Sequence, residues 1–122
     1  MFLRRQPRLD TIIGPESSLK GDLVSKGTVK IDGQFEGNVA ADSLIIGEGG
    51  ILTGDAAVRE IIIGGRVAGT IHASDGVEIQ HKGEVHGDIF AARLTIAEGG
   101  RFDGRSTMQL QKKISYTGND SA

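Results

Sequence analysis

Several residue types that stabilise compact folds are scarce or missing in this sequence. Its 122 residues include no cysteine, no tryptophan, 2 prolines, 4 phenylalanines and 1 tyrosine. Without cysteine, a disulfide scaffold and a thiolate zinc site are both excluded. With so few aromatic side chains, a single compact core filled by large residues is not expected. The longest apolar runs are three or four residues, whereas a membrane-spanning helix needs roughly 20.

Acidic residues are also scarce at the two ends of the chain. Residues 11–104 carry 8 basic and 14 acidic side chains, whereas residues 1–10 and 105–122 each have a net charge of +2. An acidic body with short basic tails argues against nucleic acid as a partner.

Glycine, in contrast, is abundant and periodic. The chain has 19 glycines, and a pattern of apolar–any–Gly–any–apolar recurs with spacings of 15 to 18 residues. A position that requires glycine in every repeat predicts a corner with positive φ or close backbone approach. The six corner glycines are Gly21, Gly37, Gly54, Gly69, Gly87 and Gly104.

A second pattern, apolar–any–Ile, lies between the copies of the first. Alternation with period two predicts strands, and a repeat of about 17 residues predicts one coil of a β-solenoid. Equivalent strands then pair in parallel, and six coils give a rod roughly 29 Å long. One inward column would hold Leu19, Phe35, Leu52, Val67, Val85 and Phe102, and another Ile13, Ile31, Ile46, Ile63, Ile79 and Ile96.

Enzymatic solenoids are the competing class. A left-handed hexapeptide helix, as in acyltransferases, requires a nearly strict six-residue step, which spacings of 15 to 18 break. A γ-type carbonic anhydrase holds zinc with histidines, but His72, His81 and His86 fall in different columns, and His86 faces outward. No phosphate-binding glycine motif is present. The placement of the histidines and the lack of this motif together predict no metal and no cofactor. A monomeric adaptor with capped ends remains a third alternative.

The acidic residues that directly follow a repeat glycine are candidates for a carboxylate site. They are Asp22, Asp55 and Asp88. A catalytic carboxylate pair requires a cleft, which short solenoid turns do not build. These aspartates are therefore predicted to form turns.

Five segments together resemble the bactofilins, a bacterial family of polymer-forming cytoskeletal proteins. They are Asp10–Gly14, Leu19–Leu23, Ile31–Gly37, Gly87–Ile89 and Leu94–Gly104. The resemblance implies a right-handed β-helix over residues 11–106, with flexible tails at 1–10 and 107–122. It further implies non-polar filaments that assemble without nucleotide, and no enzymatic activity.

The same resemblance implies where the protein works and with what. Bactofilins are cytoplasmic, lie at the inner membrane, and organise cell shape or the envelope. Their partners include further copies of the chain and, in some cases, envelope-synthesis or chromosome-segregation proteins. The opening residues Met1, Phe2, Leu3, Arg4 and Arg5 resemble the family's membrane-targeting start.

Polymerisation is also expected on physical grounds. The end coils of a solenoid carry backbone groups and apolar columns without a neighbour, and soluble solenoids hide them under caps. No amphipathic capping helix is evident before the first repeat, and the pattern dissolves into a polar stretch after Gly104. We therefore expect end-to-end stacking, with Phe102 of the last coil at such a joint.

Overall fold

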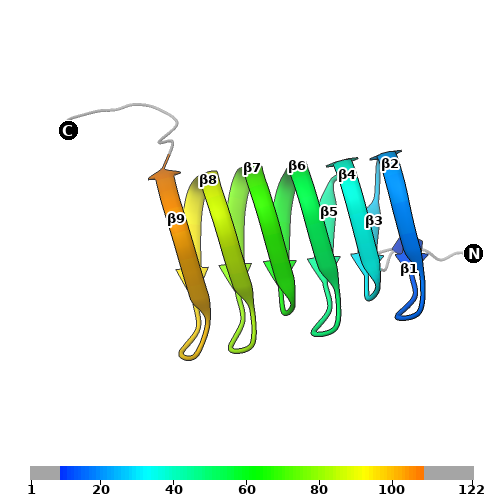
Figure 1. The fold of residues 1–122 in the computed structure, drawn as a ribbon. Coiled ribbons are helices and arrows are strands. Elements are labelled where there is room, and N and C mark those ends of the chain that lie inside the picture. The colour runs from blue at the N-terminus through cyan, green and yellow to red at the C-terminus, as the bar shows by residue number, and fades with distance from the viewer. Residues whose placement is uncertain (1–8, 109–122) are drawn as a thin grey trace, which may run out of the picture.

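The computed structural model describes residues 9–108 as a continuous run of strands and short turns, with no helix in that range. The strands are β1 (Leu9–Ile13), β2 (Ser18–Val24), β3 (Thr28–Ile31), β4 (Gln34–Ala40), β5 (Ser43–Ile46), β6 (Ile51–Ile63), β7 (Arg66–Ile79), β8 (Glu84–Ile96) and β9 (Arg101–Met108). They wind into a right-handed β-solenoid of about six coils (Figure 1). The predicted fold class is thereby confirmed.

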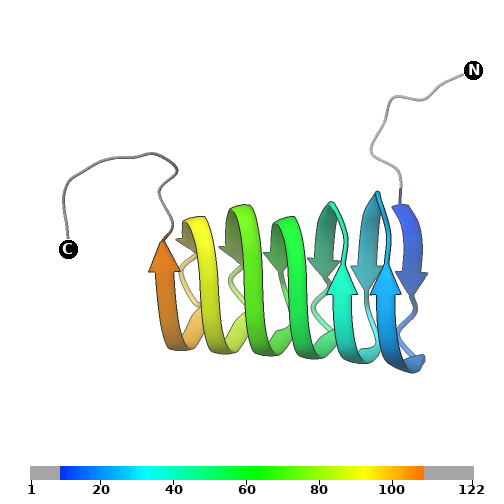
Figure 2. The same cartoon turned by 90° about the horizontal axis from the view of Figure 1, so that it is seen from above.

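Every strand pairing in the solenoid is parallel and joins residues one coil apart. Strands β2, β4, β6, β7, β8 and β9 pair in that order along one side. On the other side, β1 pairs with β3, β3 with β5, and β5 with the second half of β6. The second halves of β6, β7 and β8 then pair in that order. Seen from above, the coils stack as a rod with the described ends at opposite tips (Figure 2).

The core is a narrow aliphatic column inside the coils. Its largest fully buried residues are isoleucine, leucine and valine, and no polar or charged side chain of the described residues is buried. Because parallel pairing places equivalent residues above one another, Leu44, Ile61 and Val77 stack in one column and Ile46, Ile63 and Ile79 in the next. Few aromatics are needed because each coil contributes only a few inward side chains.

The repeat glycines stack on one another in one column and have φ between 129° and 151°. A Cβ built on Gly54 would collide with the carbonyl oxygen of Gly37 in the preceding coil. At this column the side-chain direction therefore points along the rod into the neighbouring backbone, and glycine is the residue that fits.

The aspartates that follow the repeat glycine do not form turns. Asp22, Asp55 and Asp88 lie inside β2, β6 and β8. The turn-forming role predicted for them was wrong, because the strand continues through the glycine column and its next residue still pairs with the adjacent coil.

Candidate assembly surfaces

The first end of the solenoid exposes the edge of its apolar core. Leu19 in β2 is 49% exposed, whereas Phe35 and Leu52, in the same column of the next two coils, are 4% and 0% exposed. Among the described strands, β2 pairs only with β4. An open strand edge and an uncovered leucine therefore lie together at this tip.

The opposite end shows the same combination. Phe102 in β9 is half-buried and packs against the core, whereas Val85, its counterpart one coil earlier, is fully buried. Ile96 in β8 is 43% exposed although Ile79 beneath it is 0% exposed. In the described part of the chain, β9 pairs only with β8.

Both tips can therefore take up another coil. A strand edge offers unpaired N–H and C=O groups to an incoming strand, and Leu19, Ile96 and the half-buried Phe102 lose their remaining contact with water when they are covered. Because burial from full exposure contributes about 1.5–3 kcal/mol per side chain, each of them contributes part of that amount. Phe102 lies in the last described coil and Leu19 is its counterpart at the other tip, and the polymer joint predicted at Phe102 stays a prediction.

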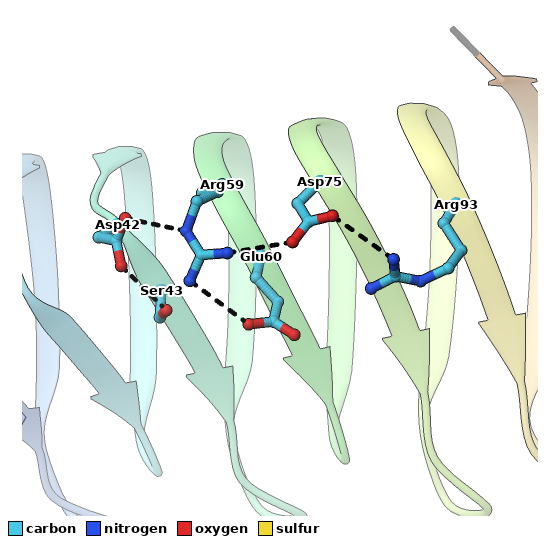
Figure 3. A network of polar contacts seen from close by, with 6 residues as sticks. All are labelled: Asp42, Ser43, Arg59, Glu60, Asp75 and Arg93. Atoms are coloured by element: carbon cyan, nitrogen blue, oxygen red, sulfur yellow. Dashed lines mark hydrogen bonds and ion pairs between the residues drawn. The ribbon is translucent and has the colours of Figure 1, made fainter. Parts of the chain in front are cut away.

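A row of alternating charges runs along one corner of the rod (Figure 3). Arg59 Nε donates to Asp42 Oδ1 at 3.1 Å in the preceding coil, and its Nη1 donates to Asp75 Oδ2 at 3.0 Å in the next. Arg93 Nη1 lies 3.4 Å from Asp75 Oδ1. The hydrogen bond to Asp42 and the nearby carboxylates raise the pKa of Arg59. We call Asp42, Arg59, Asp75 and Arg93 the charge ladder.

A second polar group connects the last three coils. Arg66 Nε donates to Glu84 Oε1 at 3.0 Å, and His86 Nε2 lies 3.2 Å from Glu84 Oε2. His86 Nδ1 is also 3.7 Å from Asp103 Oδ2 on β9. The contact with His86 first, and that with Arg66 second, lower the pKa of Glu84. The hydrogen bond of Arg66 with Glu84 therefore joins β7 to β8, and His86 alone of this group reaches Asp103 on β9.

An aromatic pair stands on the outer surface beside the charge ladder. The rings of His72 and Phe90 stack with centroids 4.9 Å apart and planes 7° from parallel. They form one wall of a surface hollow of about 330 Å³, which Ala57 and Arg59 also line.

The structure describes the three histidines but not the residues predicted to contact the membrane. His72, His81 and His86 are all exposed and belong to separate columns, and among residues 9–108 no group of three metal-ligating side chains comes together. Met1, Phe2, Leu3, Arg4 and Arg5 lie outside the described residues. Within the described range, no helix is long and apolar enough to span a bilayer.

The charge ladder and the aromatic pair were missed at the level of the sequence. A signal was present, because Asp42, Arg59, Asp75 and Arg93 follow one another at 17, 16 and 18 residues, which is one coil each. Aligning the charged residues on the glycine repeat would have revealed it.

Within residues 9–108, no further strand pairs with β2 or β9 and the apolar column is only partly covered at each tip, which is the arrangement expected of a solenoid that polymerises. Comparison with known proteins identifies the family. The family model described as "Bactofilin: Polymer-forming cytoskeletal" matches residues 11–107, and the chain belongs to this family.

Two curated relatives come from Myxococcus xanthus (strain DK1622). Bactofilin BacP is 33% identical over 100 residues, which cover 81% of this chain but 42% of BacP, so the match spans less than half of that relative. Bactofilin BacO is 32% identical over 105 residues, covering 85% of this chain and 83% of BacO.

A solved structure shares the fold. It is a cryo-EM reconstruction of Thermus thermophilus bactofilin double helical filaments, with a TM-score of 0.71 and 28% identity. The match covers 81% of this chain and 99% of the Thermus chain. Together with the family match, it supports self-assembly into a cytoskeletal filament.

Proposed function

We propose that this protein polymerises end to end, without nucleotide, into non-polar filaments at the inner face of the cytoplasmic membrane, where they organise cell shape or the envelope. One observation carries the proposal. The inward column of the solenoid is buried in its middle coils, but its terminal members are only partly covered at the two tips, where Leu19 is 49% exposed and Phe102 is half-buried. Stacking like tips against each other continues the apolar column and pairs the edge strands across the joint. This stacking requires no bound nucleotide.

Replacing Phe102, the last member of the inward column, tests the polymer joint. Phe102→Arg places a charge where the apolar column would continue, and burying an unpaired charge is strongly unfavourable. We expect filaments of the native chain under negative stain without added nucleotide, and a loss of at least tenfold in filament length for the variant. The exposed control Thr53→Arg, in the middle of the rod, should assemble normally. Filaments of native length from Phe102→Arg would place the joint elsewhere.

The membrane part of the proposal concerns Met1–Arg5. Full burial of Phe2 or Leu3 contributes about 1.5–3 kcal/mol each, and each arginine near anionic lipid contributes about 1 kcal/mol. Ordering of the tail offsets part of this, so a single chain binds weakly. A filament that displays many tails binds through avidity.

Cosedimentation with liposomes containing anionic lipid tests the tail. We expect native filaments to pellet with the liposomes, and a chain lacking residues 2–5 to stay in the supernatant while still forming filaments. Chains with Arg4→Gln and Arg5→Gln should bind less as the anionic fraction falls. Equal binding by the truncated and native chains would exclude the tail as the membrane contact.

A further inference from the structure

The N-terminal end of β1 lies at the corner of the rod that carries the charge ladder. β1 begins at Leu9, which pairs with Thr28. Thr28, Ser43 and Glu60 then follow one another in a single row, one coil apart. Because Glu60 directly follows Arg59, this row runs beside the charge ladder (Figure 3). The chain that precedes Leu9 is therefore attached next to the ladder.

The aromatic pair ends at a place where a further ring could stack. Ala57, His72 and Phe90 are equivalent residues of three successive coils. Phe90 covers one face of the His72 ring, with the centroids 4.9 Å apart. In the coil before His72, the same position holds the small, exposed Ala57, and both residues line the hollow of about 330 Å³. The hollow therefore has room for an aromatic side chain against the free face of His72.

A negative charge lies between the start of β1 and this hollow. In the row of the charge ladder, the residue one coil before Asp42 is Gly27, whose carbonyl oxygen accepts the backbone N–H of Asp42 at 3.1 Å. Asp42 is thus the first charged group of the ladder on the side of β1. Its side chain is 49% exposed, and among residues 9–108 the basic group that contacts it is Arg59. Since a carboxylate accepts several hydrogen bonds, a second guanidinium can approach Asp42 from the side of the first coil.

The residues before β1 carry an aromatic group and basic groups in the matching order. Phe2 is seven residues from Leu9, a span of up to about 23 Å, and the hollow at the level of Glu60 is three coils or about 14 Å away. Arg5 is four residues from Leu9, a span of up to about 13 Å, and Asp42 is two coils or about 10 Å away. One extended segment can therefore bring the arginine to the ladder and the aromatic ring to the hollow.

We propose that residues 2–5 dock on this corner of their own rod when no membrane is present. The ring of Phe2 stacks on His72 beside Ala57, and the guanidinium of Arg5 pairs with Asp42. The inference rests on the proposed function in one respect, because the docked residues are those proposed to contact lipid. A docked segment cannot contact lipid at the same time, so docking is an autoinhibitory contact that a membrane must displace.

Docking lowers the apparent affinity for lipid by the fraction of chains whose residues 2–5 are free. If about two-thirds of them are docked, releasing them strengthens the apparent affinity about threefold. A filament on an anionic membrane displaces the docked segments because it binds through many of them at once. Membrane binding is then favoured for filaments over single subunits.

A tryptophan in place of Phe2 reports docking directly, because the native chain has no tryptophan. The measurement is made without lipid in the double variant Leu19→Arg/Phe102→Arg, so that the tips do not join. We expect Phe2→Trp emission at shorter wavelength than that of a water-exposed tryptophan, with an anisotropy independent of protein concentration. Ala57→Phe fills the place of the third ring and should return the emission to the water-exposed value. Thr53→Phe adds the same ring in an exposed row outside the hollow and should leave the emission unchanged.

Removing the charge of Asp42 tests the second contact. Asp42→Asn keeps an oxygen that accepts from Arg59 but loses the negative charge, so at low salt the docked fraction should fall. Asp103→Asn is the matched control, since it changes the net charge equally on the exposed surface of β9. Equal tryptophan emission from the two variants at low salt would overturn the pairing of Arg5 with Asp42.

Cosedimentation of filaments with anionic liposomes tests the autoinhibition. Ala57→Phe filaments should reach half-maximal binding at about one-third of the lipid concentration that native filaments need. Thr53→Phe filaments should bind like native ones. Negative-stain images of the three samples should show the same filament length, so that differences in avidity do not contribute.

The outcomes separate this inference from the proposed function. A Phe2→Trp emission that is already water-exposed, or that does not change with Ala57→Phe, would overturn docking whether or not residues 2–5 bind lipid. Docking without tighter lipid binding by Ala57→Phe filaments would overturn the autoinhibition. Native filaments that do not pellet with liposomes would overturn the proposed membrane contact, and the tryptophan signal would still report docking.

Discussion

At the scale of single residues, the glycine column gives the sharpest stability prediction. Gly21 and Gly54 have similar φ values of 129° and 136°, but only at Gly54 would an added Cβ meet the backbone of a preceding coil. Gly21→Ala should therefore cost the conformational strain alone, about 1–3 kcal/mol. Gly54→Ala adds a collision with Gly37 that no rotamer relieves, and should reduce the free energy of unfolding by more than about 3 kcal/mol.

Thermal and urea unfolding of the two variants provide the measurement. Both should be compared in the background of the double variant Leu19→Arg/Phe102→Arg, so that assembly through either tip does not alter the apparent stability. If the two alanine variants lose the same stability, the stacking collision is not what selects glycine in the middle coils.

At the scale of strands, the contacts of Glu84 make the pairing of β7 with β8 depend on pH. Its pKa is lowered in the folded chain, because His86 and Arg66 stabilise the carboxylate. A carboxylate with a lowered folded pKa contributes stability above its unfolded pKa, and loses it as pH falls through the folded value. The contribution of Glu84 should thus be fully present at neutral pH and disappear below its ordinary pKa of 4.5.

Comparing the Tm of native and Glu84→Gln chains across pH tests this coupling. The native chain should melt higher at neutral pH, and the difference should shrink as the pH falls below about 4.5. Glu98→Gln is the matched control, since Glu98 is exposed and forms no ion pair with the described residues. A difference that stays constant down to pH 3 would exclude a role for the Glu84 contacts.

How far the sequence predicted these elements depends on whether the pattern repeats. Strand pairing and the inward columns followed from the spacing of Ile31, Ile46 and Ile63, because solenoid coils place equivalent positions above one another. The stack of His72 on Phe90 occurs between only one pair of coils, and its residues are not part of a repeated pattern. The spacing of the repeat therefore could not predict it. The high turn propensity of aspartate predicted turns after the glycines, but the hydrogen-bonded pairing of strands between coils keeps these aspartates in strands.

At the scale of the whole molecule, the two tips are different surfaces, and the order in which they meet decides filament polarity. In a non-polar filament like tips meet, Leu19 with Leu19 and Phe102 with Phe102 of the neighbouring copies. Blocking one tip then leaves the other joint intact. Leu19→Arg and Phe102→Arg should each stop assembly at a dimer, with twice the 12.8 kDa mass of the chain, and the double variant should be a monomer.

A polar filament gives the opposite pattern, because each joint would need one tip of each kind. Either single variant would then remain a monomer, and mixing the two would create a joint from the two intact tips. Size-exclusion chromatography with light scattering distinguishes the cases, using one variant carrying a mass tag. We expect two separate homodimers that do not exchange into a mixed species. Monomers that become mixed dimers on combination would show that the solenoids stack head to tail.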